Sequence, residues 1–380
     1  MKIALLTDGI FPYAMGGMQK HSYYLAKYFA QKKVEVHLYH CIQNTSYDSS
    51  KLEFFTEEEK RYLHSYIIPF PKAGKLPGHY LRESFKYSEA IYTKLKQNAP
   101  VDFIYIQGFA GWKILKAITE LEKFPRTGIN FHGMEPFQQA PGIKAKLQQL
   151  LLKRAMRYNL ENSDRIFSLG GNLTQILLDM GFHHNRIIQI PIGIEADEWI
   201  NPQINARNSI LKFVFVGRYE RRKGIEELTK AIELLPADAA FEFHFIGPIP
   251  DEKKLKDARI KYHGPISDQH KIKELITACD VLVCASYAEG MPTVILEAFA
   301  CGLAAIATDV GAVNELVSEK TGWLLAAPKV HAIRNALMDA IELPAAQLLL
   351  KKQQAQQLLL NNHRWDKLIV TTINKIAGKI

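Results

Sequence analysis

Short apolar runs alternate along the chain with stretches in which apolar residues recur every three or four positions. The runs are rich in Val, Ile and Phe, as in buried strands of a parallel sheet, and the stretches between them have the helical period. This alternation predicts an α/β fold. The predicted strands are residues 2–7, 34–39, 102–107, 127–131, 165–169, 187–190, 211–216, 241–246, 260–263, 281–285 and 304–308. The predicted helices are residues 17–31, 80–97, 111–121, 143–160, 172–180, 223–235, 268–278, 292–301, 311–317 and 364–378.

A polar stretch, N-P-Q-I-N-A-R-N at residues 201–208, interrupts the alternation soon after Gly193. Similar sets of strands and helices lie on either side of it. We therefore expect two Rossmann-like domains that face each other, the first over residues 1–192 and the second starting at residue 193.

Composition narrows the class of protein. Of the 380 residues, 47% are apolar and 23% are charged, as in a folded globular protein rather than a disordered one. The formal charge of +9 favours anionic partners such as nucleoside diphosphates, phosphorylated acceptors, anionic membrane surfaces or nucleic acid. The four cysteines form no C-x-x-C pair, and no stretch approaches the ~18 apolar residues of a membrane span. We expect a cytoplasmic protein with reduced thiols, either soluble or attached to a membrane surface.

The segment A-S-Y-A-E-G-M-P-T-V-I-L-E-A-F-A-C-G, residues 285–302, runs from a strand end into a predicted helix. Free N–H groups at such a helix start can bind an anion, and Gly290 lets a ligand approach the backbone closely. The carboxylates of Glu289 and Glu297 can accept hydrogen bonds from sugar hydroxyls. The alternative is that Glu289 only complements the helix dipole and that Glu297 is an ordinary solvated side chain.

A second segment, F-V-F-V-G-R-Y-E-R-R-K-G at residues 213–224, places Arg218 and Lys223 in the loop between a strand and a helix. Two cations at the carboxyl end of a parallel strand can neutralise a diphosphate, Arg in a bidentate manner and Lys as a point charge. Because Arg221 and Arg222 are basic too, a solvated basic turn is the alternative interpretation.

Two loops of the N-terminal half lie where doubly wound folds bind ligands. Gly16 and Gly17 fall between the first strand and the first helix, where the backbone can approach a phosphate, although a glycine pair also suits a simple turn. The pattern is not G-x-G-x-x-G, which argues against a nicotinamide cofactor. In N-F-H-G-M-E, residues 130–135, His132 follows a strand, and such a histidine is either structural or catalytic.

These segments resemble the retaining GT-B glycosyltransferases of family four, also called group 1. The likeness rests on E-x7-E from Glu289 to Glu297 with the sequence that follows it to T-G-W-L-L, and on G-R-x4-K-G from Gly217. It covers nearly the whole chain and is specific over residues 212–325. It implies two Rossmann-like domains across a deep cleft, with a donor-binding domain over residues 193–363. A last helix, about 364–380, is implied to cross back onto the N-terminal acceptor domain.

The resemblance also implies roles for single residues. Glu289 would contact the transferred sugar, Glu297 the ribose, and Arg218 and Lys223 the pyrophosphate, with His132 near the reacting carbon. The implied catalytic residues are His132, Glu289, Arg218 and Lys223. The implied donor-binding residues are Gly16, Gly17, Gly217, Arg218, Lys223, Ile266, Glu289, Gly290, Met291, Pro292, Thr293, Val294 and Glu297.

The implied reaction moves a sugar, with retained configuration, from a UDP- or GDP-sugar to a glycan or lipid-linked acceptor in cell-surface polysaccharide or lipopolysaccharide biosynthesis. No cofactor is expected, and no metal, because the sequence has no D-x-D pair at a strand end and no His/Cys cluster with ligand spacing. Nucleic acid is not expected as a partner, because the basic residues are spread along the chain without aromatic interleaving. The alternatives are a nucleotide-sugar epimerase or phosphorylase-like enzyme of the same architecture, and a non-catalytic anion-binding protein.

The predicted helix over residues 143–160 mixes leucines with Lys and Arg. Such a helix could lie on an anionic bilayer, at the inner face of the membrane, where it would bring the protein to a lipid-linked acceptor. The alternative is an ordinary amphipathic helix that packs on the domain.

Overall fold

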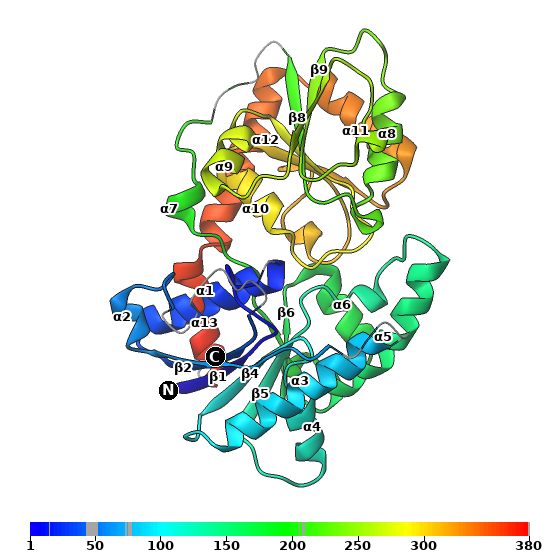
Figure 1. Cartoon of the computed structure of the whole chain (residues 1–380). Coiled ribbons are helices and arrows are strands. Elements are labelled where there is room, and N and C mark those ends of the chain that lie inside the picture. Colours follow the sequence, from blue (N-terminus) through cyan, green and yellow to red (C-terminus); the bar gives the residue numbers. More distant parts are fainter. Residues whose placement is uncertain are drawn as a thin grey trace.

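The computed structural model describes residues 1–14, 16–42, 52–72, 74, 78–204, 206 and 210–378. This part of the chain forms two parallel sheets, drawn one above the other in Figure 1, each covered by helices. The predicted α/β class and GT-B arrangement are confirmed. Among the described residues, no helix has both the length and the apolar character needed to cross a bilayer.

The first sheet has the strand order β3-β2-β1-β4-β5-β6-β7. Its inner strands are apolar on both faces, as in the aligned pairs of Ile3 with Val36 and of Leu5 with Tyr105, because helices cover both sides of a parallel sheet. The strands are β1 (Lys2–Leu6), β2 (Glu35–His40), β3 (Leu63–Ile67), β4 (Phe103–Gln107), β5 (Arg126–Asn130), β6 (Arg165–Ser168) and β7 (Ile187–Gln189). The helices are α1 (Gly17–Gln31), α2 (Glu57–Lys60), α3 (His79–Lys96), α4 (Trp112–Thr119), α5 (Ile143–Glu161) and α6 (Gly171–Asp179).

The second sheet has the order β10-β9-β8-β11-β12-β13. Figure 1 shows α8 and α11 on one face and α9, α10 and α12 on the other, and the buried apolar residues of these helices divide in the same way apart from Leu348 near the start of α12. The strands are β8 (Leu211–Val216), β9 (Phe241–Ile246), β10 (Ile260–Gly264), β11 (Val281–Cys284), β12 (Ala304–Thr308) and β13 (Gly322–Leu325). The helices are α8 (Ile225–Glu233), α9 (Gln269–Thr277), α10 (Thr293–Ala300), α11 (Val330–Glu342) and α12 (Ala345–Asn362).

The two domains are joined twice. The predicted limit at residues 192 and 193 falls in the first connection, which includes α7 (Ala196–Trp199). The chain returns after α12, where Ile194 and Arg364 form an isolated parallel bridge. The last helix, α13 (Trp365–Ile376), packs on α1, and the Trp365 ring stacks on Tyr28 with a centroid separation of 5.9 Å.

The predicted helix over residues 311–317 is wrong. Only a single 3-10 turn forms, Val313–Glu315. The preceding Gly311 adopts a left-handed φ of 59°, and an added Cβ would lie 2.2 Å from the carbonyl oxygen of Glu289. This close approach fixes a loop rather than a helix start. The sequence patterns also missed β3, β13, α11 and α12.

Each sheet reverses its strand order at one place, between β1 and β4 in the first and between β8 and β11 in the second. Loops that leave neighbouring strands on opposite sides of such a point diverge and open a crevice at the carboxyl ends of the strands. The loops after β1, β8 and β11 are those that carry the predicted glycines, cations and carboxylates.

Candidate functional site

Glu289 is the centre of the predicted site and lies in the loop between β11 and α10. Its side chain is 8% exposed, and its Oε1 accepts hydrogen bonds from Lys223 Nζ at 2.6 Å and from Ser286 Oγ at 2.7 Å. Burial alone would raise the pKa of this carboxyl, but Lys223 and Arg222 hold the pKa below its ordinary value. Glu289 is therefore a buried, ionised carboxylate at neutral pH.

The cations come from the loop after β8. Burial would lower the pKa of Lys223, whereas the contact with Glu289 raises that pKa above its ordinary value. Arg222 donates to the carbonyl oxygen of Ala288 at 3.0 Å and lies 3.6 Å from Glu289 Oε2. The interpretation of Arg222 as part of a solvated basic turn is thus wrong.

Arg218 does not join this group. Its side chain is 74% exposed and pairs with Glu220, 3.0 Å away. Arg218 and Lys223 were predicted to hold one diphosphate together, and the structure places only Lys223 against Glu289. A long exposed guanidinium can change rotamer at little cost, so the arrangement leaves Arg218 able to turn toward the crevice.

The start of α10 has the expected form for an anion-binding helix end. Pro292 is the N-cap and Thr293 the first helical residue, so the amides of Thr293 and Val294 have no partners within the helix, whereas the Ile295 N–H donates to the carbonyl oxygen of Pro292 at 3.1 Å. Met291 is buried, and its Sδ accepts from the backbone N–H of Ile192 at 3.3 Å. The other predicted residues here, Gly290, Thr293 and Val294, are partly exposed.

His132 follows β5 with a left-handed φ of 56°, a rare conformation for a residue with a side chain. Its Nε2 lies 2.7 Å from Oε1 of Gln107, and the Gln107 amide nitrogen lies 3.1 Å from Nδ1 of His21. Because an amide oxygen only accepts, Nε2 of His132 carries the proton in this arrangement. Desolvation lowers the pKa of His132 to about 3, so the ring is neutral at pH 7.

The His132 loop meets the Glu289 loop across the crevice. The Gln138 amide donates to the carbonyl oxygen of Glu289 at 2.6 Å and accepts from its N–H at 3.3 Å. A Cβ added at Gly290 would lie 3.1 Å from the carbonyl oxygen of His132. Arg222 adds an ion pair with Glu135 at 3.3 Å. The two predicted halves of the site are thus brought into direct contact.

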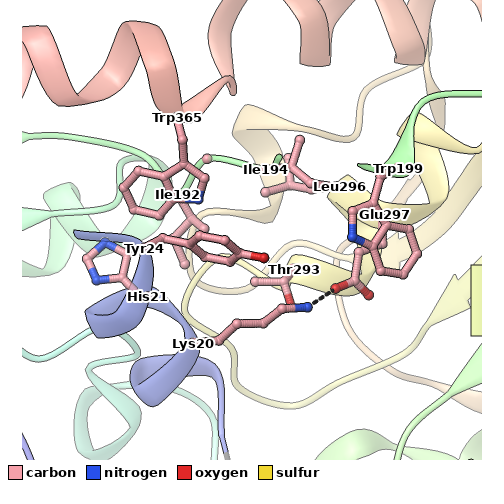
Figure 2. A pocket seen from close by; sticks show the side chains of 11 residues that line it. Lys20, His21, Tyr24, Ile192, Ile194, Trp199, Thr293, Leu296, Glu297 and Trp365 are labelled. Atoms are coloured by element: carbon pink, nitrogen blue, oxygen red, sulfur yellow. Dashed lines mark hydrogen bonds and ion pairs between the residues drawn. The ribbon is translucent and has the colours of Figure 1, made fainter. Parts of the chain in front are cut away.

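Glu297 lies one helical turn into α10 and pairs with Lys20 of α1 at 2.8 Å (Figure 2). The Lys20 amine also lies 5.6 Å from the Trp199 ring centroid. These side chains line a cavity of about 20 Å³ together with His21, Tyr24, Ile192, Gly193, Ile194, Thr293, Leu296 and Trp365. That volume holds about one water molecule, so the cavity is not large enough for a nucleotide.

The remaining predicted residues lie around this group. Gly16 and Gly17 are exposed at the N-terminus of α1, one turn before Lys20. Gly217 directly follows β8, and its N–H donates to the carbonyl oxygen of Ile246 at 2.9 Å. Ile266 is partly buried in the loop between β10 and α9.

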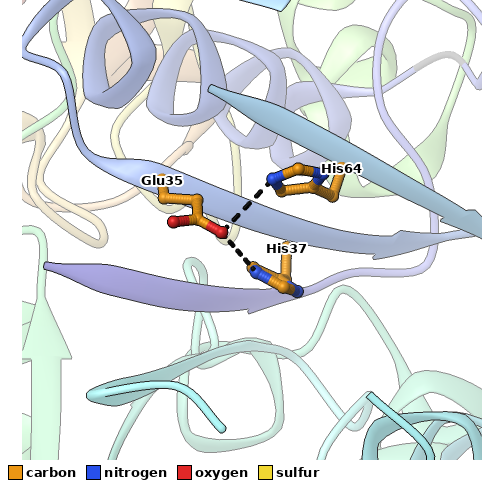
Figure 3. A group of neighbouring side chains, drawn as sticks. All are labelled: Glu35, His37 and His64. Carbon is orange, nitrogen blue, oxygen red and sulfur yellow. Dashed lines mark hydrogen bonds and ion pairs between the residues drawn. The ribbon is translucent and has the colours of Figure 1, made fainter. Parts of the chain in front are cut away.

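One group with metal-binding donor types lies elsewhere. Glu35, His37 and His64 bring their ligand atoms within 4.8 Å of one another on β2 and β3 (Figure 3). The sequence spacing gave no sign of this group, because its members come together only through strand pairing, which places His64 opposite His37. Glu35 already accepts from His37 at 3.2 Å, and Lys2 lies 3.2 Å from its other oxygen. Lys2 therefore supplies positive charge where a metal ion would.

Sequence reasoning missed Arg222, Gln138, Gln107 and Lys20 as site residues. Arg222 had a signal, since it is next to Lys223. The others had none, because their partners lie far along the chain: Lys20 is 277 residues from Glu297, and Gln138 is 151 from Glu289.

Two family profiles match consecutive parts of the chain: Glycosyltransferase Family 4 over residues 15–198 and Glycosyl transferases group 1 over residues 197–357. The putative teichuronic acid biosynthesis glycosyltransferase TuaC of Bacillus subtilis is 36% identical over 157 residues, 39% of this chain and 40% of TuaC. A Campylobacter jejuni N,N'-diacetylbacillosaminyl-diphospho-undecaprenol alpha-1,3-N-acetylgalactosaminyltransferase is 24% identical over 315 residues, 77% of this chain and 80% of that protein. The match with TuaC leaves most of both chains uncovered.

Solved structures share the whole architecture. Sucrose-phosphate synthase from Thermosynechococcus elongatus has a TM-score of 0.77 at 18% identity, over 99% of this chain and 98% of that one. Anabaena HepE in complex with UDP-glucose has a TM-score of 0.67 at 16% identity, over 99% and 100%. At such identities the likeness shows the fold alone. From the family profiles and the glycosyltransferase relatives, the chain belongs to the group 1, family 4 glycosyltransferases and is a glycosyltransferase of the GT-B fold.

Proposed function

We propose that this glycosyltransferase moves a sugar, with retained anomeric configuration, from a UDP- or GDP-sugar to a glycan or lipid-linked acceptor of a cell-surface polysaccharide. The observation that carries the proposal is the buried group of Glu289, Lys223 and Ser286 beside the start of α10. A fixed carboxylate and a fixed cation at a helix N-terminus suit a ligand that presents both sugar hydroxyls and phosphate oxygens.

In this proposal the donor lies across the switch point between β8 and β11. Lys223 and the amides of the first turn of α10 hold the diphosphate, and Arg218 turns from Glu220 to join them. Glu289 accepts from hydroxyls of the transferred sugar. Glu297 accepts from the ribose once its contact with Lys20 opens, which requires a small movement of one domain relative to the other.

The proposed reaction keeps the acceptor on the face from which the diphosphate leaves. The acceptor hydroxyl oxygen forms a bond to the anomeric carbon, the bond from that carbon to the phosphate oxygen breaks, and the phosphate takes the hydroxyl proton. A double displacement would need a free carboxylate beneath the carbon, and Glu289 is held by Lys223 and Ser286 instead. The cations stabilise the charge of the leaving diphosphate.

The relatives support the choice of substrates. HepE was solved with UDP-glucose, and the Campylobacter jejuni enzyme is named for an acceptor sugar on diphospho-undecaprenol. TuaC is named for teichuronic acid biosynthesis, which supports a polysaccharide product. We propose that the reaction takes place on the cytoplasmic side, and the free thiols of Cys41, Cys279, Cys284 and Cys301 support a reducing compartment.

We propose that neither a metal ion nor a cofactor takes part, because side-chain cations can supply the charge that the diphosphate needs. Arg218, Arg222 and Lys223 come from one loop, and two of them already lie within 4 Å of Glu289. Turnover that persists in a chelator supports this part of the proposal, and turnover restored only by an added divalent ion contradicts it.

The test is donor turnover over a panel of UDP-, GDP- and ADP-sugars, followed by identification of the product anomer by NMR. Glu289→Gln keeps the size and the Ser286 contact, and we expect it to lower turnover by at least about 100-fold. The control is Glu274→Gln, on the exposed side of α9, which we expect to be unchanged. Near-normal turnover by Glu289→Gln would contradict the proposed site.

A further inference from the structure

We propose that the outward face of α5 docks on an anionic lipid bilayer and so holds the crevice beside a membrane-borne acceptor. The docking itself is argued from the surface of α5 alone, and only the presence of an acceptor at the membrane rests on the proposed function. The α5 outer face is defined by four apolar residues: Ile143, Leu147, Leu150 and Leu151.

These four side chains are unusually exposed. Ile143 is 82% exposed, Leu147 and Leu150 are each 61% exposed, and Leu151 is 55% exposed. They make up four of the 15 exposed large apolar side chains of the described chain, within nine consecutive residues. A gathering of this kind marks an interaction surface, whereas single exposed leucines are ordinary.

The geometry of α5 separates this face from the part that packs on the domain. The spacing i, i+4, i+7, i+8 from Ile143 places the four residues on one side of the helix. Gln149, Leu152 and Met156 lie on the opposite side and are partly or fully buried. In Figure 1 the helix forms the right-hand edge of the N-terminal domain. The apolar stripe therefore points away from the protein.

The charges around the stripe favour one kind of occupant. Lys144 and Lys146 lie on either side of the apolar stripe near the start of α5, and Arg154 and Arg157 follow the stripe toward the end of the helix. The only acid of the helix is Glu161, in its last position, where it pairs with Arg157 at 2.8 Å. Leucines between cations fit a bilayer in which the apolar groups enter the acyl boundary and the cations meet lipid phosphates.

This helix is also tied to the candidate site. The Gln149 amide on its inner side donates to the carbonyl oxygens of Glu135 at 2.9 Å and Gln138 at 3.3 Å. Gln138 in turn contacts the backbone of Glu289, as described above. A bilayer on the outer face would thus lie one helix diameter from the segment that borders the crevice, a short reach for a lipid-linked sugar.

The experiment is flotation with vesicles in which about a third of the lipid is phosphatidylglycerol and the rest phosphatidylcholine. We expect the intact protein to float with these vesicles, less so at roughly 1 M salt, and to remain behind with pure phosphatidylcholine. Each Leu→Gln change on the face should lower the bound-to-free ratio by about tenfold, so Leu147→Gln/Leu150→Gln should lower it about a hundredfold.

The matched control is Leu350→Gln, because Leu350 is exposed to a similar degree, 53%, but lies on α12 of the other domain. Circular dichroism and turnover of a short soluble acceptor establish that the double variant is folded and active. Donor turnover without vesicle binding overturns the docking proposal and leaves the proposed function intact. Vesicle binding without donor turnover supports the docking proposal and contradicts the proposed function. A concentration-dependent dimer that the double variant abolishes would show that a second copy occupies the face, and would also overturn the proposal.

Discussion

Replacing Lys223 with methionine removes one charge of the buried pair at the centre of the candidate site. The side chains of Lys223 and Glu289 are 23% and 8% exposed, and their charged atoms lie 2.6 Å apart. Methionine fills a similar volume without charge, so the carboxylate of Glu289 stays buried with Arg222 at 3.6 Å and the hydroxyl of Ser286. The variant therefore measures what the lysine contributes to holding this carboxylate ionised.

Removing one partner of a buried ion pair costs about 3–5 kcal/mol of unfolding free energy. Because Arg222 remains, we expect the lower end, about 3 kcal/mol at pH 8. In the intact protein the pKa of Glu289 is lowered, which stabilises the fold above the ordinary pKa and is lost as the pH falls. Without Lys223 that pKa rises, the carboxyl becomes easier to protonate, and the difference between variant and intact protein should be smaller at pH 5 than at pH 8.

The assay is a double-mutant cycle in urea with Lys223→Met, Glu289→Gln and the double variant. We expect a coupling free energy of at least about 1.5 kcal/mol, because the double variant leaves neither charge unpaired. The control is Arg218→Met, which removes an exposed ion pair with Glu220 and should change the free energy of unfolding by less than about 0.5 kcal/mol. A coupling below about 0.5 kcal/mol between positions 223 and 289 would refute the reasoning.

Three further variants test separate parts of the account. Gly311→Ala should lower the free energy of unfolding by at least about 2 kcal/mol in thermal unfolding, because its Cβ would lie 2.2 Å from the carbonyl oxygen of Glu289. The control is Gly264→Ala, which also has a positive φ but whose Cβ would lie in open space, so it should lower the free energy of unfolding by less. Burial raises the pKa of Asp8 to about 6, so its ionisation destabilises the fold increasingly as the pH rises from about 4 to 6, and by a constant amount above that range. Asp8→Asn should therefore raise the free energy of unfolding by up to about 3 kcal/mol at pH 8 and by about half of that at pH 5, and an equal effect at both pH values would contradict the assignment. Lys20→Met should free Glu297 and tighten binding of the preferred nucleoside diphosphate by about twofold to fivefold in calorimetry, and weaker binding would exclude competition between Lys20 and the ligand.

Most of the sheet framework could be predicted because its strands are buried on both faces. Leu211–Val216 and Phe241–Ile246 are continuous apolar or alternating runs and appear as expected. β3 was missed because this edge strand, L-H-S-Y-I, is half polar. The helix predicted over residues 311–317 failed because a long-range contact of Gly311 with the Glu289 loop decides the conformation there.

The candidate site was predictable where a motif is local. Glu289 lies within one loop and Lys223 within another, and the strand order brings the two loops to one switch point. Contacts between the domains were beyond the sequence, because nothing near Gln138 or Lys20 indicates its partner. The exposure of Leu147 and Leu150 was equally hidden, since an amphipathic pattern does not say which side of a helix meets the protein.

The most direct test of the central claim is a crystal structure of the protein with UDP or GDP, whichever binds more tightly in calorimetry. The account predicts that the terminal phosphate lies within hydrogen-bond distance of Lys223 Nζ and the first amides of α10, with Arg218 turned toward it and the ribose hydroxyls on Glu297. A nucleotide bound elsewhere, with the Lys223–Glu289 and Lys20–Glu297 contacts undisturbed, would contradict it.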